Sequence, residues 1–363
     1  MFKSSKKPTG NVVPKPTPEL VLPTVEKPLK PQPQSKAPSK TTKLPSIAKG
    51  GNEEGKGRPA YLLHRDLVIG RGSYGQVCIA SREAPANSKS GKRRKFASKC
   101  VTLKPEPKYI AKLQEEVCVL KELRGHPFII QLYDVLCISS ELFIITELGR
   151  GGDLFHLLTT HPKHGVTEAY AAKSISQMLS AVTYMHEKNI AHRDLKLENW
   201  VLMSPNAWSD LKLIDFGLST HFERTSQGTK LMSRVVGSSY YVSPQVLKRS
   251  YTEACDLWSL GVIAYMLLSG APPFFGASDT LIKQAIVNGT YTFPTSLFKD
   301  VSEEAKGFVC SLLSYAPEYR LTARQALNHP WLLAAAPKTV SYSTSQSATL
   351  SNNDTEGSTS MSS

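Results

Sequence analysis

The chain has 363 residues, 40% of them hydrophobic, which is enough to bury the core of one large domain or of two. It carries a net charge of +14, and none of its six cysteines lies in a C-x-x-C pair. This pattern argues against a zinc site or a disulfide framework and predicts reduced thiols in a cytoplasmic protein, with a nuclear location as the alternative. No apolar run of about 18 residues is present, so the sequence predicts no membrane span.

Residues 1–60 form a basic arm that holds 12 Lys or Arg, four Asp or Glu, and 11 of the 24 prolines. A segment of this composition cannot bury a core, so it is predicted to be disordered, with polyproline II character. The stretch KPLKP at residues 27–31 could bind an SH3-type domain, and the lysines could bind an anionic partner such as lipid or nucleic acid. A solvated tail is the simpler interpretation. Residues 334–363 form a Ser/Thr-rich tail of the same kind.

The next part of the chain, up to about residue 147, is predicted to be rich in strands. The strand-like runs lie at residues 61–72, 75–83, 95–103 and 141–148. One helix interrupts them at residues 108–125, where Ile110, Leu113, Val117 and Leu120 recur at helical spacing. Gly125, followed by a proline, marks the end of this helix.

From about residue 150 onward, the pattern is predominantly helical. The clearest helices are predicted at residues 167–189, 255–270 and 302–313. A small strand-rich part followed by a larger helical part predicts an α+β fold of two lobes, at about residues 61–147 and 150–333. A cleft between two such lobes is a usual place for a ligand site.

Three glycines follow the first strand, in the stretch GRGSYGQV. Gly70, Gly72 and Gly75 would let the backbone approach a phosphate group and direct N–H groups at it. Alone, this spacing is a weak signal, because a dinucleotide-binding turn has it too. A dinucleotide turn requires a helix directly after it, whereas this sequence continues into another strand.

Charged residues follow two further apolar runs. Lys99 emerges from the strand at residues 95–103, and Glu116 on the inward face of the predicted helix can supply the carboxylate that such a lysine needs. An ordinary lysine at the end of a strand is the alternative. Asp215, in the stretch LIDFGLS, follows a strand and precedes a glycine, which suits a carboxylate that binds Mg²⁺.

The stretch HRDLKLEN at residues 192–199 places Asp194, Lys196 and Asn199 in a short loop between two apolar segments. The four motifs, in this order, resemble those of the eukaryotic protein kinase family over residues 61–333. The resemblance implies a bilobal kinase fold, ATP and Mg²⁺ as cofactors, and proteins as substrates.

On the nucleotide side, the resemblance implies that Lys99 holds the α- and β-phosphates of ATP and pairs with Glu116. Thr146 would be the gatekeeper residue behind the adenine, and it is small enough to admit bulky inhibitors. The other residues expected to contact ATP are Gly70, Gly72, Gly75, Val77, Glu147 and Leu148.

On the side of the chemistry, the resemblance assigns one role to each polar residue of the loop. Asp194 would accept the proton of the substrate hydroxyl, and Lys196 would place a cation near the γ-phosphate. Asn199 and Asp215 would bind Mg²⁺. Asp256, in the stretch CDLWSLG, would be the buried residue that orients the loop.

The form Asp-Leu-Lys resembles Ser/Thr kinases, and Ser238 takes the place of the family's threonine that bonds the base. Asp153 and Glu198 match positions that face basic residues of the substrate. Substrates with Arg or Lys two to three positions before the acceptor are therefore expected. The alternative for Asp153 is a simple cap of a helix that begins at Leu154.

Longer stretches such as GRGGDLFHLL and YRLTARQALNHPWL are similar to the calcium/calmodulin-dependent group. LIDFGLSTHFE is most similar to the calcium-dependent protein kinases of plants and protists. The sequence has no D-x-[DN]-x-[DN]-G loop and no basic amphipathic helix after Leu333. Activity is therefore expected not to require calcium acting on this chain, with a separate calcium-binding subunit as the alternative.

The sequence departs from the family at two places. Gln245 stands where the family has a glutamate that pairs with an arginine, here Arg320, so a partial loss of stability is expected. Arg234 stands at the usual phosphorylation site of the activation loop. The alternatives for control of this loop are phosphorylation at Ser233 or Thr229, Glu223 facing Arg193, and constitutive activity.

Two rival functions come from other classes. A pseudokinase scaffold would tolerate the loss of Lys99, Asp194, Asn199 or Asp215, yet the sequence retains all four. A nucleic-acid-binding protein with a basic arm is suggested by the charge alone. An active Ser/Thr kinase is therefore the favoured interpretation.

Overall fold

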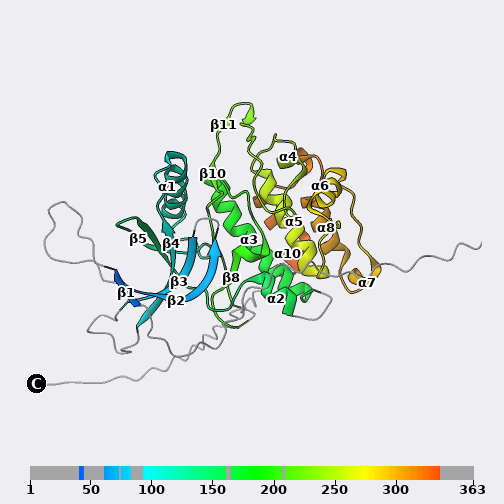
Figure 1. The fold of residues 1–363 in the computed structure, drawn as a ribbon. Helices are drawn as coiled ribbons and strands as arrows, with labels where there is room; N and C mark the ends of the chain where they lie inside the picture. Colours follow the sequence, from blue (N-terminus) through cyan, green and yellow to red (C-terminus); the bar gives the residue numbers. More distant parts are fainter. Residues whose placement is uncertain are drawn as a thin grey trace, which may run out of the picture.

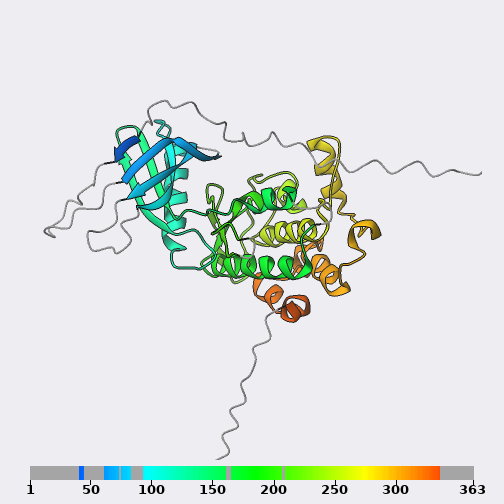
Figure 2. The same ribbon diagram turned by 90° about the horizontal axis from the view of Figure 1, so that it is seen from below.

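The computed structural model of the chain describes residues 41–44, 61–72, 75–82, 93–160, 165–206 and 209–335. The KPLKP stretch and residues 336–363 lie outside these ranges. A sheet with one long helix forms one lobe, and a larger group of helices forms the other (Figure 1). The same two lobes are distinct in the view from below (Figure 2). The α+β architecture of two lobes that the sequence predicts is therefore confirmed.

The sheet of the first lobe is antiparallel, with the strand order β1-β2-β3-β4-β6-β5. Its strands are β1 Thr41–Leu44, β2 Tyr61–Gly72, β3 Gly75–Arg82, β4 Arg94–Thr102, β5 Leu132–Ile138 and β6 Glu141–Thr146. β1 departs from the prediction that residues 1–60 have no regular structure, since it pairs with residues 61–64 of β2. Its two adjacent threonines favour a strand, and the edge of β2 offers unpaired backbone groups.

Helix α1, Pro107–Glu122, lies beside this sheet (Figure 1). A proline in its first turn loses no intrahelical hydrogen bond. Leu113, Val117 and Leu120 are buried, as their helical spacing predicts, whereas Ile110 is 37% exposed and does not join the core. Glu116 is 3% exposed, which is unusual for a carboxylate and points to a partner inside the protein.

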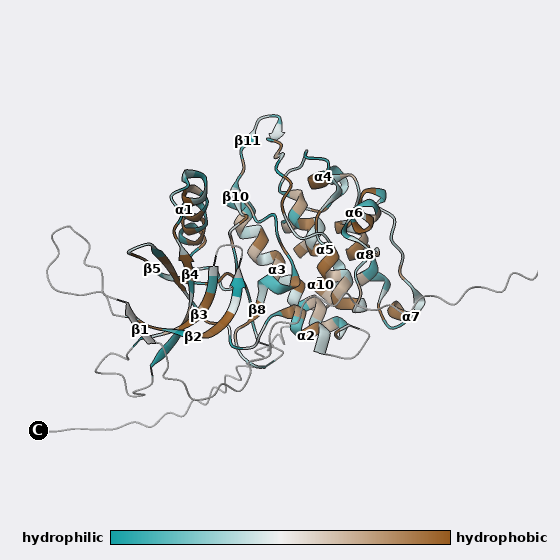
Figure 3. Ribbon diagram, viewed as in Figure 1, coloured by the Kyte–Doolittle hydropathy of each residue, from teal (hydrophilic) through white to brown (hydrophobic). Residues whose placement is uncertain are grey.

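Helix α5, Ala254–Ser269, forms the centre of the second lobe. All of its residues from Cys255 to Ser269 are buried, and most of them are apolar (Figure 3). α3 Glu168–Glu187 and α8 Glu303–Leu312 begin at Thr167 and Ser302, whose side chains cap the helix N-termini. The three predicted helices are confirmed. No helix in the described ranges has both the length and the apolar character needed to cross a membrane.

The remaining helices surround this centre or cover its ends. They are α2 Leu154–Thr160, α4 Pro244–Leu247, α6 Asp279–Asn288, α7 Thr295–Phe298, α9 Ala323–Leu327 and α10 Pro330–Ala335. Within the described ranges, short strands form three further two-stranded sheets. These strands are β7 Ile190–Ala191, β8 Trp200–Leu202, β9 Leu211–Leu213, β10 Thr220–His221, β11 Arg224–Thr225 and β12 Gly228–Thr229. The β11–β12 hairpin lies away from the large sheet (Figure 1). The pairs β7–β10 and β8–β9 fix both ends of the loop at residues 192–199.

Candidate active site

A cavity of about 770 Å³ lies between the two lobes. The sheet, the hinge (residues 147–150) and the loop at residues 192–199, called the catalytic loop below, all contribute to it. The residues singled out in the sequence that line it are Gly70, Val77, Lys99, Glu116, Thr146, Glu147, Leu148, Asp153, Lys196, Glu198, Asn199 and Asp215. Gly72 and Gly75 pair at the tip of the neighbouring hairpin, and Asp194 is not itself a lining residue but bonds Lys196, which is one. Residues far apart in the sequence thus meet at one place.

The glycines of the β2–β3 hairpin are not equivalent. A Cβ atom at Gly75 would lie 2.0 Å from the carbonyl oxygen of Cys100 on β4, which no side chain can tolerate. At Gly70 the nearest atom would be a side-chain carbon of Val77, at an ordinary 3.9 Å. The close approach of β3 to β4 therefore requires a glycine at position 75, whether or not a phosphate group binds near it.

A lysine with two carboxylates joins the lobes across the cavity. The Nζ atom of Lys99 lies 2.5 Å from Oε1 of Glu116 on α1 and 3.4 Å from Oδ1 of Asp215. Burial opposes the charge of the ammonium, but the two carboxylates outweigh it and raise the pKa of Lys99 above its usual range. Burial likewise opposes ionisation of Asp215, yet the charge of Lys99 brings the pKa of that carboxyl below its usual value. The cavity therefore holds a charged ammonium and an ionised carboxylate.

The polar residues of the catalytic loop form a closed triangle of hydrogen bonds with Ser238. Lys196 donates to Oδ2 of Asp194 at 2.8 Å and to Oγ of Ser238 at 3.1 Å. The hydroxyl of Ser238 in turn donates to Oδ1 of Asp194 at 2.9 Å. Asn199 donates its amide to the backbone oxygen of Asp194 at 2.9 Å. Both carboxylate oxygens of Asp194 are thus fixed in direction.

The carboxylate of Asp256, at the start of α5, anchors the backbone of this loop. Its carboxylate is fully buried and accepts hydrogen bonds from the backbone N–H groups of His192 and Arg193, at 2.9 and 2.8 Å. The ring of His186 bonds the same carboxylate at 2.9 Å. Burial opposes its ionisation, but these hydrogen bonds prevail and lower the pKa of Asp256. Arg193 has a φ of 68°, a strained conformation that this anchor holds in place.

The donor set near Asp215 fits Mg²⁺. This hard cation takes oxygen ligands and commonly uses one or two carboxylates together with phosphate oxygens. Asp215 supplies an ionised carboxylate, and Asn199 turns its NH₂ group toward the backbone, which leaves its amide oxygen as an acceptor. Within the described ranges there is no cluster of three His, Cys, Asp or Glu that could hold a metal. The remaining ligands of a cation here would therefore come from phosphate and water.

The two carboxylates expected to face the substrate, those of Asp153 and Glu198, line the same cavity. Asp153 also accepts a hydrogen bond from the backbone N–H of His156 at 2.8 Å, so it does cap α2. Glu198 accepts a hydrogen bond from the hydroxyl of Tyr241 at 3.4 Å, and burial raises the pKa of its carboxyl. Capping and substrate contact are compatible for Asp153, because capping engages only one of its two carboxylate oxygens.

Arg320 is almost fully buried below the activation segment (residues 215–245). Its guanidinium donates to the backbone oxygens of Ser314 and Ala254 and, at 3.2 Å, to Oε1 of Gln245. The amide of Gln245 donates to the backbone oxygen of Tyr315 at 2.6 Å. Gln245 thus offers the carbonyl acceptor expected from the sequence, but no charge.

The activation segment is held by contacts that the sequence did not indicate. Arg193 donates to the backbone oxygen of Leu218 at 2.8 Å and to the hydroxyl of Tyr251 at 3.4 Å. Tyr251 itself donates to the backbone oxygen of Arg234 at 2.7 Å. The expectation that Glu223 faces Arg193 is not met, because Glu223 pairs with Lys230 at 3.1 Å. No motif marks Tyr251, which lies 58 residues from Arg193.

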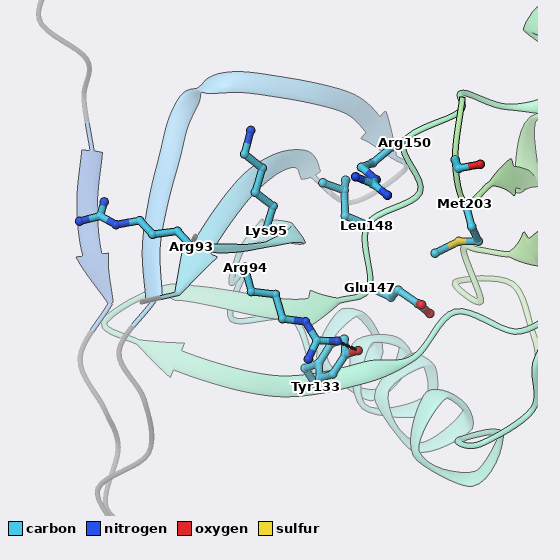
Figure 4. Close-up of a pocket in the computed structure, with 9 residues that line it drawn as sticks. Arg93, Arg94, Lys95, Tyr133, Glu147, Leu148, Arg150 and Met203 are labelled. Atoms are coloured by element: carbon cyan, nitrogen blue, oxygen red, sulfur yellow. Dashed lines mark hydrogen bonds between the residues drawn. The ribbon is translucent and has the colours of Figure 1, made fainter. Parts of the chain in front are cut away.

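A second cavity, of about 710 Å³, adjoins the hinge (Figure 4). It shares Glu147, Leu148 and Arg150 with the first cavity. Its other lining residues are Arg93, Arg94, Lys95, Tyr133, Met203 and Ser204. Arg94 stacks on the ring of Tyr133, and Glu147 pairs with Lys212 at 2.9 Å. The outer side of the hinge is therefore predominantly basic, although its cations spread apart rather than converge (Figure 4).

Known proteins resemble this chain over both lobes. Residues 63–332 match the protein kinase domain. Calcium-dependent protein kinase 4 of Plasmodium berghei is 37% identical over 268 residues, which are 73% of this chain and 48% of that protein. CDPK-related kinase 4 of Arabidopsis thaliana is 37% identical over 290 residues, 78% of this chain and 46% of that protein.

Calcium/calmodulin-dependent protein kinase type 1 of Caenorhabditis elegans is 36% identical over 266 residues, which are 73% of this chain and 72% of that protein. The chain spans about half the length of the calcium-dependent relatives named above. The protein kinase match nevertheless runs from residue 63, in β2, to residue 332, in α10, and so includes most of the sheet and of the helical lobe. Because the matched residues include both lobes and the cavity between them, the chain belongs to the protein kinase family.

Proposed function

We propose that this chain is a serine/threonine protein kinase that transfers the γ-phosphate of ATP to protein hydroxyls. The observation that carries the proposal is the meeting of two bonded groups at one cavity. The first is Lys99 with Glu116 and Asp215, and the second is Asp194 with Lys196 and Ser238. Phosphoryl transfer depends on positioning and on charge stabilisation, and these groups supply both.

The first group serves the nucleotide. The ammonium of Lys99 remains charged because two carboxylates raise its pKa, so it can bind phosphate oxygens. Asn199 and Asp215 would hold Mg²⁺, which would neutralise negative charge on the phosphates. Val77 and Leu148 line the cavity, and such apolar walls suit a purine ring.

The second group serves the acceptor. Asp194 is held by Lys196 and Ser238 so that its carboxylate can take the proton of an incoming Ser or Thr hydroxyl. Lys196 lies 2.8 Å from this carboxylate, and its positive charge would stabilise the negative charge on the γ-phosphate during the transfer.

We further propose that substrates carry Arg or Lys two to three positions before the acceptor. Asp153 and Glu198 both line the cavity. Burial disfavours the ionised form of Glu198, and a substrate cation would offset that burial.

A peptide array with Mg-ATP tests both statements. We expect Ser and Thr peptides with upstream Arg to be phosphorylated, and matched peptides with Glu at the same positions to be poor substrates. The variant Asp153→Asn keeps a side chain that caps α2 but removes the charge. It should reduce the preference for Arg about tenfold without lowering the melting temperature. An array without any phosphorylated peptide contradicts the kinase proposal, and an array without an Arg preference contradicts the substrate proposal alone.

We also propose that catalysis by this chain does not require calcium. The contacts between Lys99, Glu116 and Asp215 and those around Asp194 are made by the chain's own residues. The purified chain should therefore phosphorylate a peptide at the same rate with calcium and with a chelator in the presence of Mg²⁺. A rate that rises with calcium contradicts this statement.

A further inference from the structure

Two carboxylates of α1 reach the chain segment that follows Asp215. The hydroxyl of Thr220 donates to Oε1 of Glu115 at 2.7 Å, and the ring of His221 lies 3.0 Å from Oε2 of Glu122. Glu115 and Glu122 are seven residues apart, which is two helical turns, so they share one face of α1. Glu116, the partner of Lys99, directly follows Glu115.

The same segment is tied to the catalytic loop on its other side. Thr220 and His221 form β10, which pairs with Ala191 and Ile190 of β7, directly before the loop. The backbone N–H of Phe222 donates to the backbone oxygen of Asn189 at 2.9 Å. β10 therefore lies between the helix that carries Glu116 and the strand that leads to Asp194 (Figure 1).

We propose that Thr220 is a positioning residue for phosphoryl transfer, because its bond to Glu115 fixes the rotation of α1 that places Glu116 on Lys99. The proposal rests on the kinase function proposed above. Neither the motifs nor the family comparison singles out Thr220, which lies 105 residues from its partner.

For two reasons, the contact between Thr220 and Glu115 should stabilise the position of α1 more than the contact between His221 and Glu122 does. A hydroxyl bonded to a carboxylate at 2.7 Å is a charge-assisted hydrogen bond, and both side chains are half-buried. His221 and Glu122 are each nearly half exposed, at 45% and 46%, so solvent and salt screen that pair. Without the Thr220 hydroxyl, β10 would keep the weaker His221–Glu122 contact with α1, beside the apolar packing of α1, and Glu116 would leave Lys99 more readily.

The test compares six forms of the full chain, which include wild type, Thr220→Val, Thr220→Ser and Glu116→Gln. The combination Thr220→Val with Glu116→Gln completes a double-mutant cycle. Valine keeps the shape of threonine without the hydroxyl, and serine keeps the hydroxyl. Thr159→Val is the matched control, because Thr159 is exposed and its hydroxyl donates to backbone oxygens of its own helix. Steady-state kinetics with Mg-ATP and a peptide give kcat and KM, and melting curves report on folding.

We expect Thr220→Val to lower kcat/KM by about tenfold, as the loss of a hydrogen bond to a charged group implies, while Thr220→Ser and Thr159→Val stay near wild type. In the Glu116→Gln background the same change should have little further effect, because Thr220 acts through Glu116.

Wild-type rates in Thr220→Val overturn the proposal, and so does a loss that serine does not restore or that adds fully to Glu116→Gln. If Thr220→Val melts early, Glu115→Ala removes the same bond with a good helix former and must show the same loss. An inactive wild-type chain would instead count against the kinase function itself.

Discussion

At residue 245, a glutamine faces an arginine that is only 5% exposed. Burial lowers the pKa of Arg320 to about 10, which means that folding disfavours its charged form. The folded-state pKa lies below the usual value of about 12.5, so the burial penalty is fully present at neutral pH and is relieved only above about pH 10. Three backbone-oxygen bonds and one bond to the neutral amide of Gln245 offset the penalty in part.

The first prediction concerns this pair. Gln245→Glu should raise the free energy of unfolding by about 1 kcal/mol, because a charged acceptor strengthens the bond to Arg320 while the bond to Tyr315 is lost. Gln245→Ala, which removes both bonds, should lower it by about 1–3 kcal/mol. Urea denaturation at pH 7 measures both. A glutamate variant less stable than the alanine variant would contradict the role given to Arg320.

The second prediction concerns Asp256. Asp256→Asn should destabilise the protein by about 3–5 kcal/mol at pH 7, because an amide cannot accept from all three of its N–H partners. The folded-state pKa is depressed, so the stability from this carboxylate is present above the unfolded pKa of about 3.9 and is lost as the pH falls through the folded value. The difference between wild type and variant should be constant from pH 5 to 8 and shrink below about pH 4. Denaturation curves across this range that show a growing difference would be inconsistent with it.

At the scale of secondary structure, the glycines of the β2–β3 hairpin meet two requirements: close packing of β3 on β4 and room for a phosphate group. The third prediction is that Gly75→Ala lowers the melting temperature, because the added methyl group would overlap the backbone of β4. Gly70→Ala is the matched control and should melt near wild type, since its methyl group meets only an ordinary contact. Thermal unfolding followed by circular dichroism decides between them, and equal melting temperatures would show that β3 can move away from β4.

The fourth prediction concerns β6. Thr146, its last residue, lines the cavity beside Ile144 and Ala97. Thr146→Met should weaken inhibitors that extend past this position by about tenfold or more, while the KM for ATP changes little. Inhibition curves for one bulky and one small ATP-competitive compound measure this. Unchanged inhibition by the bulky compound would place the gatekeeper elsewhere.

Elements with a strong local pattern could be predicted from the sequence. The predicted helices at residues 167–189, 255–270 and 302–313 agree with α3, α5 and α8 to within two residues, because long apolar periods and capping residues mark them. β1 was missed because four residues carry too little pattern, and its strand depends on pairing with β2.

The site shows the same division. Most of its motif residues line the cavity, although Gly72, Gly75 and Asp194 are not among the lining residues, and each motif is short and recognisable in the sequence. The contacts of Arg193 with Tyr251 and of Glu115 with Thr220 join residues 58 and 105 positions apart. Such contacts depend on how helices and strands pack, which no local spacing encodes.

On the scale of the whole molecule, the two lobes depend on each other through the cavity. Lys99 and Glu116 belong to the sheet lobe, whereas Asp215 and the catalytic loop belong to the helical lobe. The 3.4 Å contact between Lys99 and Asp215 is therefore a contact between lobes. The hydrophobic core that contains α5 also includes Val117 and Leu120 of α1. Apolar packing and the Lys99–Asp215 ion pair therefore both hold the two lobes together.

The most direct measurement is the rate of peptide phosphorylation by wild type and by Asp194→Asn with Mg-ATP. Asparagine keeps the shape of Asp194 and can still accept a hydrogen bond from Lys196, so the variant should fold and bind ATP. Loss of a general base lowers rates on the order of 10²–10⁴-fold, and we expect kcat to fall by that factor with the KM for ATP little changed. A wild-type chain that phosphorylates Ser and Thr peptides no faster than Asp194→Asn would contradict the assignment of this site to phosphoryl transfer.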